Sequence, residues 1–151
     1  MSCRDGLALG IAFTCPADLK LYATSEFLKL LSHFFAASDL PYALAAMQAH
    51  EMGHVVQYAV HQPGINDRST DAVSRAIEQQ ADCLSGVWAR HQAVKGGVDV
   101  ARFRRVAVEG ITLISSNAEI ATHGTPAQRG AAIDRGLSGG RPQACKLATF
   151  Q

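Results

Sequence analysis

The sequence has 151 residues, of which 48% are hydrophobic and 18% charged. These values are typical of a globular protein, and the length predicts one domain, residues 1–151, that buries about two thirds of its unfolded surface. The formal net charge of +1 provides no basic surface for nucleic acid, and no stretch approaches the ~20 apolar residues that span a bilayer.

Two short runs near the N-terminus predict β-strands. Leu7–Cys15 consists mostly of small and apolar residues, Pro16-Ala17-Asp18 follows as a turn, and Leu19–Tyr22 alternates between apolar and other residues. We expect these runs to form a β-hairpin. A signal peptide fits less well, because the apolar segment Gly6–Phe13 is short for one and follows the single basic residue Arg4.

Residues 25–37 predict an amphipathic helix. Their apolar side chains recur at helical spacing, at Phe27, Leu30, Leu31, Phe34 and Phe35. Such a face normally points into the protein, so we expect these residues to belong to the core and not to a ligand site.

The next predicted helix, residues 40–60, contains His50-Glu51-Met52-Gly53-His54, with Asp39 suited to be its N-cap and Pro41 in its first turn. Positions i and i+4 share one helix face, so both histidines can reach one metal ion. Glu51 lies about 100° further round, where it can act on a metal-bound water without being a ligand. This spacing is typical of zinc hydrolases, in which the glutamate takes a proton from water and passes it to the leaving amine.

A following helix carries Glu78 and Asp82, again four residues apart on one face. The helix is otherwise largely apolar, and the two carboxylates would repel each other without a cation nearby. We expect Glu78 to be the third zinc ligand and Asp82 to accept the second ring N–H of a ligating histidine. Two alternatives stay open: a surface carboxylate pair near Arg75 and Arg90, and His61 as the third ligand.

Two more helices are predicted in the C-terminal part. Gly96-Gly97 ends the Glu78 helix, and Asp99 caps a helix with apolar residues between Val100 and Ile114. Thr125-Pro126-Ala127-Gln128 is a capping box that starts a last short helix. His123 is expected in the loop before this box, where it either donates to the oxyanion of a tetrahedral intermediate or bonds to the backbone.

The four cysteines, Cys3, Cys15, Cys83 and Cys145, include no pair at the C-x-x-C spacing typical of structural zinc sites. Four cysteines allow three disulfide pairings, and the sequence alone does not choose among them. Disulfides would indicate an oxidising compartment, whereas free buried thiols would indicate the cytosol.

Taken together, these segments resemble the bacterial "putative neutral zinc metallopeptidase" family, a group of zincins with a glutamate third ligand. The similar segments are Ala49–Gln57, Glu78–Ala89, Phe13–Asp18, His123–Arg129 and the closing Gly139, Gly140 and Cys145, so the resemblance spans roughly Cys3 to Phe150. It implies an α+β, zincin-like fold that is mostly helical with a small N-terminal β-hairpin. It further implies one Zn²⁺ per chain, a peptide or protein substrate, and the disulfides Cys3–Cys15 and Cys83–Cys145.

The sequence departs from this family in three places. Val55 stands where similar members often have a third histidine, but it would point away from the metal. Ser115-Ser116-Asn117 replaces a Gly-Asp-Asp segment, and the family's usual N-terminal membrane or export segment is missing. A trimmed form of an exported or anchored precursor, located outside the cytoplasm, is therefore favoured over a cytoplasmic protein.

We expect a zinc endopeptidase in which Glu51 and His123 are the catalytic residues. The alternative is a zinc-containing binding or scaffold module that performs no catalysis. The intact Glu51 favours the enzyme, because a module without activity has no need of a base.

Overall fold

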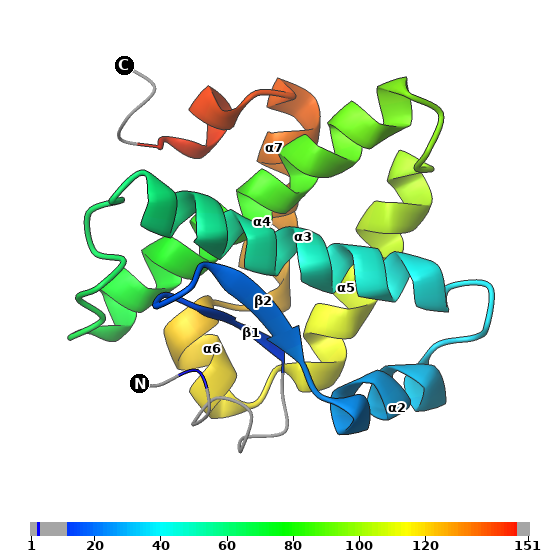
Figure 1. Ribbon diagram of the computed structural model, residues 1–151. Helices are drawn as coiled ribbons and strands as arrows, with labels where there is room; N and C mark the ends of the chain where they lie inside the picture. Colours follow the sequence, from blue (N-terminus) through cyan, green and yellow to red (C-terminus); the bar gives the residue numbers. More distant parts are fainter. Residues whose placement is uncertain (1–2, 4–11, 148–151) are drawn as a thin grey trace.

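The computed structural model describes Cys3 and residues 12–147 (Figure 1). In chain order the elements are β1 (Ala12–Cys15), β2 (Lys20–Ala23), α2 (Ser25–Phe34), α3 (Leu40–Ala59), α4 (Asp71–Val94), α5 (Val100–Ile114), α6 (Asn117–His123), α7 (Pro126–Gly139) and the 3-10 helix η1 (Pro142–Cys145). The predicted fold class, mostly helical α+β with an N-terminal hairpin, is confirmed. None of the described helices is long and apolar enough to cross a bilayer.

The two strands form an antiparallel hairpin that lies against α3 (Figure 1). Ala12 lies opposite Ala23, and Cys15 lies opposite Lys20. The predicted hairpin is therefore present, and the part of its first run at residues 7–11 lies outside the described residues. The hairpin matters for the site because it brings β1 next to the helix with the two histidines.

The helix α4 is the centre of the fold and packs against α3, α6, α7 and η1 (Figure 1). One face of α4 is buried, and the core cluster around Ala89 joins it to α3, α5 and α7 through Ala49, Phe103, Ala107, Ile111 and Ile133. Glu78 and Asp82 belong to the buried residues of this helix. Their carboxylates therefore need partners from neighbouring elements.

The helices α3 and α4 cross closely at Gly53 and Ala81. A Cβ atom added to Gly53 would lie 2.9 Å from the Cα of Ala81, which is closer than real Cβ atoms come. Glycine therefore permits the approach. Because Gly53 precedes His54 and Ala81 precedes Asp82, the same crossing brings the histidine face and the carboxylate face together.

Two predictions about the helices are wrong, and the first concerns α2. Phe35, just beyond this helix, is buried against α3 and α5, but Leu30 is 46% and Phe34 50% exposed. The expectation that all the apolar residues of this segment are core residues is wrong, because α2 lies at the edge of the molecule and is covered on one side only (Figure 1).

The second correction concerns Asp39, which precedes α3 but forms no side-chain cap. Its carboxylate accepts hydrogen bonds from Arg102 at 2.8 Å and from Arg105 at 3.0 Å, both on α5. Two guanidinium groups thus take the oxygens that would have capped the helix. By contrast, the capping box of Thr125 and Gln128 at the start of α7 is present as predicted.

Candidate metal centre

Two histidines of α3 and one glutamate of α4 converge at the crossing of the helices. The Oε2 atom of Glu78 lies 3.1 Å from Nε2 of His50 and 3.2 Å from Nε2 of His54. One donor atom from each residue lies within 4.8 Å of the others, and Glu78 is only 2% exposed. Two imidazole nitrogens and one carboxylate oxygen form the donor set that zinc takes in hydrolases, so the residues fit this metal.

His50 is oriented from behind by a buried ion pair. Its Nδ1 atom lies 2.8 Å from Oδ1 of Asp82, and Arg129 of α7 donates two hydrogen bonds to the same carboxylate, at 2.8 and 2.9 Å. In a neutral ring whose Nδ1 donates to a carboxylate, the lone pair is on Nε2, the atom that faces Glu78. The expected contact between Asp82 and a histidine is therefore present in the structure.

His54 is oriented in the same way by an amide. Its Nδ1 atom lies 2.7 Å from Oε1 of Gln57, a residue that is fully buried at 0% exposed. The amide nitrogen of Gln57 donates in turn to the carbonyl of Ile77 and to Oε1 of Gln80, both at 2.8 Å. These bonds of the amide nitrogen fix the amide so that its oxygen, and not its nitrogen, faces the histidine, and hence they fix the tautomer of the ring.

Sequence reasoning gave no role to Gln57 or to Arg129. A signal for Gln57 was available, because it follows His54 by three residues and so lies on the buried face of α3. For Arg129 the signal was weaker. It is one of two arginines on α7, and its partner could be found only once the packing of α7 against α4 was known.

Without a metal ion, the pKa values of these groups depend on one another. Burial lowers the pKa of His50, but the carboxylates of Asp82 and Glu78 raise it to about 10. Burial raises the pKa of Glu78, but hydrogen bonds from His50 and His54 hold it well below its usual range. A metal ion bound by these groups would take the place of the proton on His50, so its binding releases a proton.

Glu51 lies on α3 beside the cluster and faces the hairpin. The hydroxyl of Thr14, on β1, lies 2.7 Å from the main-chain oxygen of Glu51 and 2.9 Å from its carboxylate atom Oε2. The side chain of Glu51 is thereby held by a strand and not by the metal-site residues. Thr14 is another residue whose contact with the site the sequence did not predict.

His123 approaches the cluster from α6. Its Nε2 atom lies 3.4 Å from Oε2 of Glu78, while Nδ1 lies 2.8 Å from the hydroxyl of Thr122 and 3.1 Å from Glu119. The expectation that His123 lies in a loop is wrong. It is the last residue of a short helix, which forms because the Ser116 side chain caps its first turn.

Two further side chains bear on the choice of ligands. Arg68, in the loop between α3 and α4, forms an ion pair with Oε1 of Glu78, and its side chain is 36% exposed. His61, the rival third ligand, lies just past the end of α3 with φ of 51° and is not among the three residues of the cluster. The geometry thus brings Glu78, and not His61, to the two histidines.

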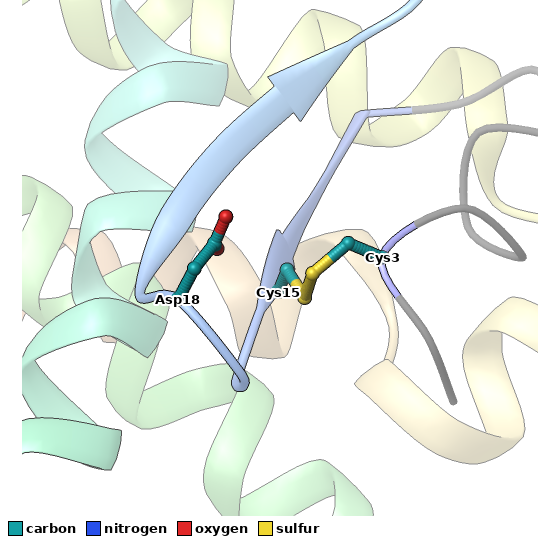
Figure 2. Close-up of side chains that lie close together, drawn as sticks. All are labelled: Cys3, Cys15 and Asp18. Carbon is teal, nitrogen blue, oxygen red and sulfur yellow. A yellow bond between two sulfur atoms is a disulfide. The ribbon is translucent and has the colours of Figure 1, made fainter.

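A second group of possible ligands, Cys3, Cys15 and Asp18, lies at the hairpin (Figure 2). The two cysteines are paired as a disulfide with Cα atoms 5.5 Å apart, so they offer no thiolates to a metal. Cys83 and Cys145 form the second pair, with Cα atoms 5.6 Å apart. Both predicted pairings are thus at disulfide distance in the structure.

The family model described as "Putative neutral zinc metallopeptidase" matches residues 1–150. The Escherichia coli (strain K12) "uncharacterized protein YpfJ" is 26% identical over 95% of this chain and 56% of its own length. The "uncharacterized protein Rv2575" of Mycobacterium tuberculosis (strain H37Rv) and the "uncharacterized protein Mb2605" of Mycobacterium bovis are each 36% identical over 51% of this chain. The matched part makes up 27% of these mycobacterial proteins, so the chain corresponds to only part of the length of its relatives.

No solved structure matches the chain. Since the family model covers nearly every residue, the chain belongs to the putative neutral zinc metallopeptidase family.

Proposed function

We propose that the chain is a zinc-dependent peptidase whose single Zn²⁺ is held by His50, His54 and Glu78. The observation that carries the proposal is that these three donors converge beside Glu51. In the motif, Glu51 stands at the position of the general base. The bound metal would polarise the scissile carbonyl and make a water molecule more acidic. The family to which the chain belongs supports a peptide or protein as the substrate.

In this proposal Glu51 moves the protons. It accepts one from the attacking water and returns it to the leaving nitrogen, so the peptide bond breaks without a free hydroxide or a free amide anion. Glu51 suits this task because Thr14 holds its carboxylate and no cationic side chain pairs with it in the described part of the chain.

His123 would donate a hydrogen bond to the oxygen of the polarised carbonyl. Its Nε2 atom is the ring nitrogen turned towards the cluster, because Nδ1 lies against the hydroxyl of Thr122, at 2.8 Å, and the carboxylate of Glu119, at 3.1 Å. That Nε2 atom faces the cluster, 3.4 Å from Glu78. A donor positioned before the reaction stabilises developing negative charge without reorganisation.

We further propose an extracytoplasmic location. Two cysteine pairs at disulfide distance support it, because disulfides persist in oxidising compartments.

The test combines metal analysis with a peptide-library cleavage assay, with and without a chelator. Glu51→Gln should keep one zinc per chain while turnover collapses, because the base is lost and the ligands are not. His123→Ala should keep zinc and lower kcat by about 10²–10³, whereas the control His91→Ala, on the opposite end of α4 from Glu78, should change neither. A wild-type protein that holds zinc and cleaves nothing would favour the zinc-containing binding module instead.

A further inference from the structure

We propose that Thr14 is a positioning residue that holds the carboxylate of Glu51 in the orientation needed for proton transfer. The inference rests on the proposed peptidase function and assigns the β-hairpin a part in it. Its basis is the pair of contacts between the Thr14 hydroxyl and Glu51, at 2.7 Å to the main chain and 2.9 Å to the side chain.

A base must be held in place because proton transfer requires contact. The acceptor atom has to lie about 2.6–3.2 Å from the atom whose proton it takes, and small misplacements reduce the rate strongly. A glutamate side chain has three rotatable bonds and on a half-buried helix face visits several rotamers. Among the described residues, Thr14 is the only one whose side chain binds the Glu51 carboxylate.

The geometry leaves one carboxylate oxygen available. Thr14 contacts Oε2, and no described side chain contacts Oε1. One oxygen is therefore fixed by the protein, and the other is free to meet a water molecule. The hydroxyl has a single proton, which it shares between Oε2 and the main-chain oxygen of Glu51, at 2.9 and 2.7 Å, so Thr14 is held to both parts of this residue.

The strand that carries Thr14 is itself firmly anchored. Thr14 pairs with Leu21 across the hairpin, and the next residue, Cys15, is 1% exposed and joined to Cys3 (Figure 2). Threonine is also branched at Cβ, which restricts its first side-chain rotation. A short hairpin at the edge of a helical protein thus presents one hydroxyl at a fixed position.

The kinetic test compares Thr14→Val, which keeps the shape and removes the hydroxyl, with Thr14→Ser, which keeps the hydroxyl. We expect Thr14→Val to lower kcat about tenfold or more, with KM within about twofold and one zinc per chain retained. Thr14→Ser should recover most of the rate. Equal losses in both variants would overturn the proposal, because a variant that keeps the hydroxyl would then be no better than one that lacks it.

A second measurement needs no catalysis. A double-mutant cycle of Thr14→Val and Glu51→Ala, measured as shifts in the urea midpoint of the chelated protein, reports the coupling between the two side chains. We expect Thr14→Val to shift the midpoint less when Glu51 is already alanine. Equal shifts would overturn the proposal, even if the wild-type protein cleaved no peptide and the proposed function failed.

Discussion

Replacing Gly53 with alanine tests whether the site depends on the close crossing of α3 and α4. The added Cβ would lie 2.9 Å from the Cα and 3.0 Å from the carbonyl oxygen of Ala81. Both atoms belong to the main chain, so no side chain can rotate away to make room. The two helices have to move apart.

The size of the effect follows from two opposing contributions. Alanine favours a helix over glycine by about 1 kcal/mol, whereas forcing extra volume into a packed contact costs about 1–3 kcal/mol. Because the Gly53 contact is with main-chain atoms, the upper end of this cost applies. We expect a net loss of about 2 kcal/mol in the free energy of unfolding, or roughly 4–8 °C in Tm for a chain of this size.

Gly110 on α5 provides the matched control. A Cβ there would lie 3.5 Å from the nearest atom of the Phe35 ring, which is an ordinary contact. Gly110→Ala should therefore gain up to about 1 kcal/mol from helix propensity alone. The two variants make the same chemical change in a helix, and we expect them to change the free energy of unfolding in opposite directions.

The assay is urea unfolding with zinc chelated, followed by zinc affinity measured by competition. Because ligand distances tolerate only about 0.2 Å, Gly53→Ala should weaken zinc binding on the order of tenfold or more, and Gly110→Ala should leave it unchanged. If Gly53→Ala raises Tm and keeps the zinc affinity, the helices can approach without glycine. The close crossing would then not be what assembles the site.

Three more outcomes are expected. Glu78→Gln should weaken zinc binding far more than His61→Ala in a competition assay. The reverse order would show that His61, and not Glu78, is the third ligand. In protein from an oxidising host, peptide mapping by mass spectrometry should find Cys83 joined to Cys145, and alkylation of both thiols in the unreduced protein would refute the pairing. Burial raises the pKa of Asp82, but a histidine and an arginine lower it by more, so the pKa lies below its usual value. The chelated protein should therefore lose the stability that this carboxylate contributes as the pH falls below about 4. An acid titration of Asp82→Asn should lack that loss.

The grouping of the candidate site residues could be predicted in part from local spacing. Helical periodicity places His50 and His54 on one face, and Glu78 and Asp82 on another, without any knowledge of the packing. What periodicity cannot supply is the partner of each face. It could not choose between Glu78 and His61 as third ligand, because this depends on where α4 begins after the loop.

The parts that were missed or wrong depend on packing between distant segments. The α6 helix is shorter than the ~12 residues at which helices become stable alone, so its contacts decide whether it forms. The exposure of Phe34 on α2 has a related cause, since a pattern reveals an apolar face and not what covers it. Arg129 reaches Asp82 from 47 positions away, which no local pattern encodes.

The site residues lie far apart in the sequence, and this has a consequence for how the protein acquires its metal. His50 and Glu78 are 28 positions apart, and the arginine that orients the site is further along the chain. An unfolded chain would have to close these long loops to gather the donors, so it offers zinc no competing site of this kind. The complete site is therefore expected to form only in the folded protein, and the stabilisation by zinc should rise with the ratio of the free zinc concentration to Kd.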